Sequence, residues 1–322
     1  MLHDRRSFIG AMAVIALAPR WVQAQTQASQ PLRIVVPFSA GSGTDITARV
    51  LADTITKGTG RPVIVDNKAG AGGSLGALEV ARARPDGSTV LYTTGGFTTN
   101  AVLMKKLPFD SIVDFTPVTR LTRSSGFALL VRDKSPYKTI DEFVAAAKAK
   151  PGDLTFGSSG VGNTTHVMGV LFCRGVGVDL LHVPFKGTPS TDLIAGTVDC
   201  AFISPSVAHQ QINAGQLRAL GISGVVRSPL LPEVPTFAEA RLSVQDIPAW
   251  SGVWAPAKLP ASLLESMYQT LANAVQAPAF VKFARESGGE PDSQRPDAFK
   301  AYVTAEIERY RKLLPPLGIE MS

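Results

Sequence analysis

The sequence is poor in cysteine, with two among 322 residues. Two thiols cannot build the disulfide framework that holds small secreted domains together, so the fold must rest on a hydrophobic core. Cys173 and Cys200 both have apolar neighbours, which is typical of buried core positions. Whether the two are bridged stays open, because a sequence does not fix the separation of their Cα atoms.

Aromatic residues are also scarce, at 7% of the chain, and no run of lysine and arginine is interleaved with them. Single-stranded nucleic acids are bound on such aromatic stacking platforms, so no nucleic-acid partner is expected. The formal net charge is +6 at pH 7. A modest positive charge of this kind favours the approach of a small anion.

Several motifs that mark enzymes and cofactor sites are missing. The chain has no G-x-G-x-x-G fingerprint and no Gly-Lys-[Ser/Thr] of a phosphate-binding loop, which argues against nucleotides. In the stretch FGSSGVGNTTH, Ser159 lacks the second glycine of a hydrolase elbow, since Val161 stands there. The histidines show no H-E-x-x-H spacing. The sequence therefore predicts a chain that is not an enzyme, with no catalytic residue, cofactor or metal.

The first residues are typical of an export signal. Arg5 and Arg6 precede an apolar run over 8–18, and Val22-Gln23-Ala24 has the small-residue spacing of a signal-peptidase site. We therefore predict a signal peptide over 1–24, cleaved after Ala24, and a periplasmic mature protein. The stretch DRRSFIG also resembles a twin-arginine signal, so the export route stays open.

Strand-like and helix-like runs alternate along the remaining chain, which favours an α/β fold with parallel sheets covered by helices. About 300 residues are enough for two domains. The expected strands cover 33–36, 63–65, 89–93, 128–131, 154–157, 181–183, 200–203, 217–222 and 252–255. The expected helices cover 45–57, 74–83, 140–149, 166–173, 206–214, 261–276, 279–287 and 297–314. Two less regular segments, 114–132 and 221–235, are expected to cross between the domains.

Glycine-rich loops follow three of these strands, at 39–45, 67–77 and 156–166, and each precedes an expected helix. The start of a helix leaves backbone N–H groups unpaired and carries a partial positive charge, so such a loop suits an anion. The alternative is an ordinary strand-to-helix turn with Thr44 as N-cap. Because backbone N–H groups and Ser or Thr hydroxyls can hold a carboxylate without arginine, we expect an organic acid bound between two domains.

Ordered motifs along nearly the whole mature chain resemble one family. These are VPFSAGSGTDITAR, NKAGAGGSLGALEVARARPDGSTV, PFDSIVDFTPV, TFGSSGVGNTTH, HVPFKG with TDLIAGTVD, GQLRALGIS, RSPLLPEVPTFAEA and WSGVWAPAKLP. The chain thus resembles the Bug-type extracytoplasmic solute receptors, the TctC substrate-binding components of tripartite tricarboxylate transporters. The resemblance implies a type II-like periplasmic binding protein with two α/β lobes and a ligand cleft between them. The expected lobes are 31–122 with 222–322, and 123–221.

The resemblance also implies which residues contact the ligand. The first loop contributes Phe38, Ser39, Ala40, Gly41, Ser42, Thr44 and Asp45, and the second contributes Ser158, Ser159, Asn163, Thr164 and Thr165. In the first helical turn, the Asp45 carboxylate is expected to order the loop, since it would repel an anion. Ser204 is added because it follows an expected strand.

The implied function is capture of a small organic carboxylate by a monomer and its delivery to the membrane permease subunits of a tripartite tricarboxylate transporter. One alternative is a receptor that feeds a sensor kinase. Another is an enzyme that acts on a carboxylated substrate in the cleft.

Overall fold

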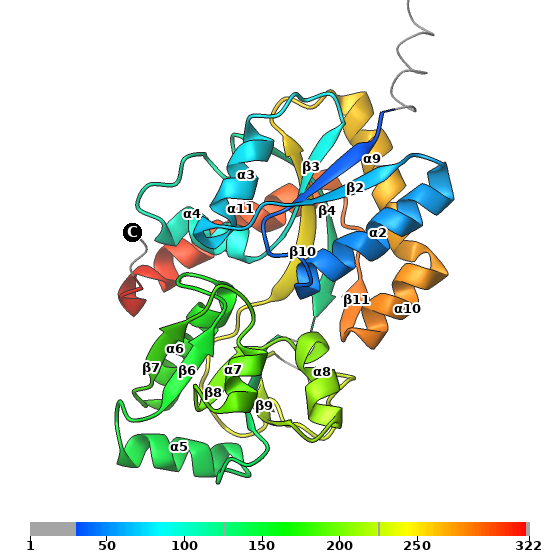
Figure 1. Cartoon of the computed structure of the whole chain (residues 1–322). Helices are drawn as coiled ribbons and strands as arrows, with labels where there is room; N and C mark the ends of the chain where they lie inside the picture. The colour runs from blue at the N-terminus through cyan, green and yellow to red at the C-terminus, as the bar shows by residue number, and fades with distance from the viewer. Residues whose placement is uncertain (1–29, 125, 225, 320–322) are drawn as a thin grey trace, which may run out of the picture.

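The computed structural model describes residues 30–319 apart from 125 and 225. The expected signal peptide over 1–24 and its cleavage site lie outside the described residues. Two lobes, each a sheet with helices on both faces, lie one above the other (Figure 1). This confirms the expected α/β fold with two lobes.

The first lobe is built on a six-stranded sheet of order β11-β4-β10-β3-β1-β2. Its strands are β1 (Leu32–Val36), β2 (Val63–Asn67), β3 (Thr89–Thr94), β4 (Phe115–Ser124), β10 (Ala249–Pro256) and β11 (Gly289–Pro291). Its helices are α2 (Gly43–Thr59), η1 (Ala71–Gly73), α3 (Ser74–Ala81), α4 (Gly96–Leu103), α9 (Ala261–Gln276), α10 (Pro278–Glu286), α11 (Pro296–Leu313) and η2 (Pro315–Leu317).

The second lobe is built on a five-stranded sheet of order β7-β6-β8-β5-β9. Its strands are β5 (Ala128–Arg132), β6 (Thr155–Ser158), β7 (Leu181–Pro184), β8 (Cys200–Ile203) and β9 (Leu217–Ile222). Its helices are α5 (Ile140–Ala149), α6 (Thr164–Val176), α7 (Ser190–Ala195) and α8 (Pro205–Asn213). Cys173 and Cys200 are both free thiols within this lobe.

The prediction of purely parallel sheets is wrong, because both sheets are mixed. Strands β1, β2 and β3 pair in parallel, as do β6, β7 and β8, but β10 runs antiparallel to β3 and β5 runs antiparallel to β8. Strands β10 and β5 are each the first strand after a crossing between the lobes, so the chain enters each sheet without a crossover helix. Parallel pairing needs such a crossover.

The segments that cross between the lobes are shorter than expected, and most of the segment 114–132 forms strands. The segment 114–132 contains β4 and β5, which are joined by a short stretch around Gly126. The N–H of Phe127 donates to Ser223 Oγ at 2.9 Å, and the N–H of Ser223 donates back to the Phe127 carbonyl at 2.9 Å. The two crossing segments are therefore hydrogen-bonded to each other where they leave the second lobe.

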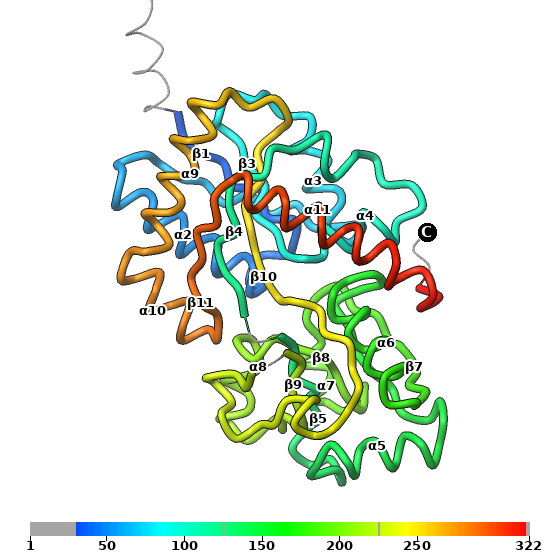
Figure 2. Tube along the Cα trace, turned by 180° about the vertical axis from the view of Figure 1, so that it is seen from behind, coloured from blue at the N-terminus to red at the C-terminus, as the bar shows by residue number. Residues whose placement is uncertain are grey.

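The segment after Ser223 packs on the second lobe, although it was expected to belong to the first. Leu231, Phe237 and Ile247 all lie in the hydrophobic clusters of the second sheet, although the sequence assigned 222–322 to the first lobe. The return to the first lobe comes at β10. Tyr310 near the end of α11 and Leu314 just after it also pack on the second lobe, and Figure 2 shows α11 crossing the first lobe and ending beside the second.

Each sheet has buried apolar side chains on both faces. In the first lobe, β-strand residues such as Val36 and Val253 pack against α2, α9 and α10, while Val35 and Trp254 pack against α3, α4 and α11. Trp254 is fully buried, with its ring 4.8 Å from that of Phe97 between centroids. Burial of such apolar area, at about 25 cal/mol per Å², fixes the sheets and so the loops at their ends.

Candidate functional site

Four helices begin where the two lobes face each other, two from each lobe. From the first lobe come α2, which begins at Gly43, and α4, which begins at Gly96. From the second lobe come α6, which begins at Thr164, and α8, which begins at Pro205. Each follows directly on a strand of its own sheet, so the sheets position all four helix starts.

Two sets of contacts bring these helix starts together across the lobes. A Cβ built on Gly43 would lie 3.2 Å from Val207 Cγ2, so the starts of α2 and α8 touch. On the other side, Thr99 Oγ1 of α4 donates to the carbonyl of Gly162, just before α6, at 3.0 Å. A Cβ on Gly95 would lie 3.6 Å from Thr164 Cγ2, an ordinary van der Waals distance, so the starts of α4 and α6 also lie side by side.

The start of α2 is held by its own side chains. Ser42 is the N-cap, and its Oγ accepts from the N–H of Asp45 at 3.3 Å. The buried Asp45 carboxylate accepts from the Gly41 N–H at 2.8 Å, from Arg49 Nε at 3.0 Å and from Asn67 Nδ2 at 3.0 Å. Burial raises the pKa of Asp45, but the bonds from Arg49, Gly41 and Asn67 outweigh burial and leave this pKa below its ordinary value.

The start of α6 is capped in a similar way. Asn163 is the N-cap, and its Oδ1 accepts from the N–H of Thr165 at 3.1 Å. Thr165 Oγ1 in turn accepts from the N–H of Ser159 at 2.9 Å, which ties the loop back onto the helix. Gly160 and Gly162 both have positive φ, at 118° and 74°, a backbone shape that favours glycine.

Two stacked histidines lie beneath this loop. The rings of His166 and His182 are parallel to within 7°, with their centroids 3.7 Å apart. His166 Nδ1 accepts from the N–H of Gly162 at 3.0 Å, and His182 Nε2 lies 2.7 Å from Ser158 Oγ. Burial lowers the pKa of His166 to about 3, with a contribution from His182, and burial lowers the pKa of His182 to about 4. Both rings are therefore neutral near pH 7.

Three hydroxyl groups at the starts of α2 and α6 have no protein partner among the described residues. The hydroxyls of Ser39, Thr44 and Ser159 make no hydrogen bond within the described part of the chain. The first N–H groups of α2, α4 and α6 have no partner within their helices, as at every helix start. No lysine or arginine belongs to the first turns of the four helices. The arrangement can therefore hold an anion through neutral donors.

The predicted ligand residues lie at three of the four helix starts, those of α2, α6 and α8. Ser39, Ala40, Gly41, Ser42, Thr44 and Asp45 form the turn into α2, Ser159, Asn163, Thr164 and Thr165 form the turn into α6, and Ser204 precedes α8. Phe38 packs partly against the first-lobe core. Asp45 and Ser158 have their polar atoms in hydrogen bonds within the protein, so the structure gives both a loop-ordering role.

Three details differ from the sequence interpretation. Ser42, rather than Thr44, caps α2. Helix α4 was not among the expected helices, although GGFTTN after β3 shows the same strand, small residues and helix as the other loops. Residues 72–76 also match G-x-S-x-G, but Ser74 is buried at the start of α3 and bonds to no histidine among the described residues.

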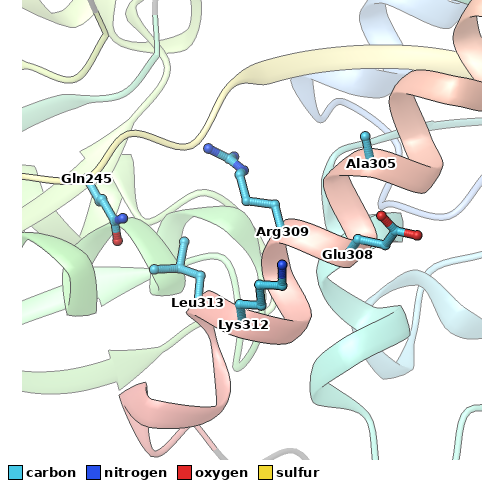
Figure 3. Close-up of a pocket in the computed structure, with 6 residues that line it drawn as sticks. All are labelled: Gln245, Ala305, Glu308, Arg309, Lys312 and Leu313. Carbon is cyan, nitrogen blue, oxygen red and sulfur yellow. The ribbon is translucent and has the colours of Figure 1, made fainter.

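One surface pocket lies away from the four helix starts. A surface pocket of about 480 Å³ is lined by Gln245, Ala305, Glu308, Arg309, Lys312 and Leu313 (Figure 3). It lies along α11, and none of the four helix starts contributes to it. No group of three or more His, Cys, Asp or Glu side chains in 30–319, leaving aside 125 and 225, is placed to hold a metal ion. Across the same stretch, no helix has the length and apolar character to span a membrane.

Two α/β lobes that face each other with helix starts define a solute-binding protein of the periplasmic binding protein fold. The solved structures agree. Periplasmic binding protein BugD has a TM-score of 0.85 and 30% identity, covering 91% of this chain and 99% of that one. R. palustris Rpa4515 with adipate has a TM-score of 0.85 and 30% identity, covering 90% of this chain and 98% of that one. MatC from Rhodopseudomonas palustris with bound malate has a TM-score of 0.81 and 31% identity, covering 88% of this chain and 98% of that one.

Residues 47–319 match the family described as the tripartite tricarboxylate transporter family receptor, TctC, and the chain belongs to that family. This confirms the resemblance seen in the sequence. Members of the family and the solved neighbours are substrate-binding receptors, so the chain is a receptor and not an enzyme.

Proposed function

We propose that this chain binds a small organic carboxylate between its two lobes, in the periplasm, and delivers it to the permease subunits of a tripartite tricarboxylate transporter. The observation that carries the proposal is the meeting of four helix starts from two lobes without a cation in their first turns. Rpa4515 with adipate and MatC with malate support a carboxylate as the ligand class.

The available donors are sufficient for useful affinity. A hydrogen bond to a charged group contributes about 1.5 to 3 kcal/mol, and micromolar binding corresponds to about −8 kcal/mol. Three or four such bonds, from backbone N–H groups and from the hydroxyls of Ser39, Thr44 and Ser159, give a binding free energy in this range after the costs of ordering are subtracted. Hydrogen bonds bridged by a water molecule contribute nearly as much as direct ones.

The ligand is held between lobes that also touch each other, which links binding to closure. A ligand that contacts both α2 and α6 favours the closed form by its difference in affinity for the two forms. The permease would then recognise the closed form. Export by the signal peptide over 1–24 with cleavage after Ala24, and action as a monomer, complete the proposal.

A thermal-shift screen of carboxylic acids on ligand-stripped protein, residues 25–322, tests the ligand class. Adipate and malate serve as the first probes, with the matching amides or alcohols as uncharged controls. A ligand present at 100 times its Kd stabilises the folded state by about 2.7 kcal/mol, which gives a clear shift. Stabilisation by acids but not by their uncharged analogues is expected, and the reverse order would contradict the proposal.

A further inference from the structure

Glu306 is a buried carboxyl group directly behind the start of α4. Its side chain comes from α11 and is 5% exposed. Glu306 Oε1 lies 3.0 Å from Trp250 Nε1 and 3.1 Å from the Tyr302 hydroxyl, both of which donate to it. Glu306 Oε2 lies 2.7 Å from Thr98 Oγ1. One oxygen therefore has two donors, and the other has a single threonine hydroxyl.

The Thr98 hydroxyl has one proton but two close oxygen neighbours. Besides Glu306 Oε2, the carbonyl oxygen of Gly95 lies 2.7 Å from Thr98 Oγ1. Both distances are those of a full O–H···O hydrogen bond. A proton shared between two acceptors gives longer contacts, as at Thr99, where the two oxygens lie 3.0 and 3.1 Å away. A carbonyl cannot donate, so both contacts are full hydrogen bonds only when Glu306 carries the second proton.

The surroundings of Glu306 favour this neutral form. Burial raises the pKa of Glu306 above its ordinary value of 4.5, although the bonds from Thr98, Trp250 and Tyr302 and the charge of Arg309 act the other way. Tyr302 and Tyr310 on α11 are neutral phenols with raised pKa values. Arg120 on β4 lies over the Tyr302 ring at 4.6 Å and is paired with Asp292 at 2.6 Å.

We infer that Glu306 is a protonated, neutral carboxylic acid at pH 7 and that it positions the start of α4. Its Oε2–H donates to Thr98 Oγ1, the Thr98 hydroxyl donates to the Gly95 carbonyl, and Oε1 accepts from Trp250 and Tyr302. Each short contact of Thr98 Oγ1 then has a proton of its own, whereas an ionised carboxylate would leave the Gly95 carbonyl and Glu306 Oε2 sharing the single Thr98 proton.

A neutral acid has a consequence for the helix start in front of it. Gly95 is fixed from both sides, because its N–H also donates to the Trp250 carbonyl at 3.3 Å. The fixed turn presents Thr99 to Gly162 across the lobes. A negative charge behind α4 would oppose an anion at its first N–H groups, whereas a neutral acid does not. This last step rests on the proposed function, and the protonation state does not.

The test compares Glu306→Gln with Glu306→Ala in the mature chain. A glutamine reproduces the neutral acid, since its Nε2 can donate to Thr98 and its Oε1 can accept from Trp250 and Tyr302. Glu306→Gln is expected to keep the wild-type melting temperature at pH 5, whereas Glu306→Ala lowers it. Because the folded state keeps a proton that the unfolded state loses above pH 4.5, the contribution of Glu306 to stability falls as the pH rises, and Glu306→Gln removes that contribution to the pH dependence.

Glu308→Gln, an exposed position on the same helix, is the matched control and should leave the pH dependence as in wild type. Carboxyl ¹³C NMR, with the Glu306 signal assigned by its loss in Glu306→Gln, reads the protonation state directly. A protonated signal at pH 7 is expected. An ionised signal at pH 7, or Glu306→Gln as unstable as Glu306→Ala at pH 5, would overturn the inference.

Adipate binding at pH 7 adds the functional arm. The Kd of Glu306→Gln is expected to stay within about twofold of wild type, and that of Glu306→Ala to rise about tenfold. Equal Kd values for wild type and Glu306→Ala would contradict the positioning role. Absence of adipate binding by wild type would count against the proposed function, while NMR and melting data, which need no ligand, still decide the state of Glu306.

Discussion

Thr99 of the first lobe donates its hydroxyl to the carbonyl of Gly162 in the second lobe, at 3.0 Å. The N–H of Gly162 donates to His166 Nδ1, also at 3.0 Å. Gly162 is thus bound by α4 on one side and by α6 on the other. The shape of the loop before α6 and the approach of the lobes are therefore coupled through this residue.

Thr99→Val should weaken ligand binding about fivefold to tenfold, since a neutral hydrogen bond contributes about 1 kcal/mol and the Gly162 carbonyl would lose its partner across the lobes. Isothermal titration with the tightest acid measures the change. Thr270→Val, which removes a hydroxyl bonded only within α9, serves as control. An unchanged Kd in Thr99→Val would show that this contact does not contribute to closure.

Gly43→Ala tests the contact between α2 and α8. The new Cβ would lie 3.2 Å from Val207 Cγ2 of the second lobe, so the approach of the lobes should be hindered and the affinity should decrease several-fold. Alanine is better than glycine in a helix by about 0.5 to 1 kcal/mol, so the melting temperature without ligand should not fall. The double variant Gly43→Ala with Val207→Ala should recover affinity. Failure to recover would mean that the loss has another cause.

The stacked histidines predict a loss of stability in acid. Burial lowers the pKa of His166 to about 3, so the unfolded state takes up a proton below pH 6.5 that the folded state refuses until about pH 3. The contribution of His166 to the unfolding free energy should therefore be fully present above pH 6.5 and fall toward acid, by up to about 1.4 kcal/mol per pH unit.

His166→Asn separates titration from structure. The asparagine Oδ1 can still accept from the Gly162 N–H, but it does not titrate, so urea unfolding between pH 4 and 7 should show a flatter pH dependence. His209→Asn, on α8, is the control, since its ring bonds to Asn213 of the same helix. A pH dependence in His166→Asn as steep as in wild type would contradict the assignment.

Ser42→Asp distinguishes the cap of α2 from its proposed role in anion binding. Aspartate is as good an N-cap as serine and favours the helix dipole, so the stability of the empty protein should be kept. The added negative charge should repel a carboxylate and reduce affinity by at least about tenfold. Ser42→Asn keeps the cap without the charge and should bind. Equal affinity in Ser42→Asp and Ser42→Asn would place the anion elsewhere.

The local part of this architecture could be predicted from the sequence. A strand, a loop of small residues and a helix start together occupy only about fifteen residues. They can be recognised in the sequence because caps and turns depend on neighbouring side chains. The turns that contain Ser42 and Asn163 were therefore placed at helix starts correctly. Which hydroxyl caps α2 depends on one hydrogen bond, and the sequence offered Thr44 as the cap in its alternative of an ordinary turn, where the structure has Ser42.

The long-range part could not be predicted. The Thr98 and Glu306 side chains meet across 208 residues of sequence, and Thr99 meets Gly162 across 63. Such contacts depend on how the sheets order their strands, which hydrophobic periodicity does not encode. The same limit explains why β4 was taken as an irregular crossing, although Val118 and Leu121 of that strand are fully buried in the first-lobe core.

A crystal structure of the mature protein with its tightest carboxylic acid tests the central claim most directly. The account predicts one carboxylate of the acid within hydrogen-bond distance, directly or through one water, of the N–H groups at the start of α2 and of hydroxyls such as Thr44. An acid clamped by arginine or lysine, for example by Arg309 and Lys312 in the pocket along α11, would contradict it.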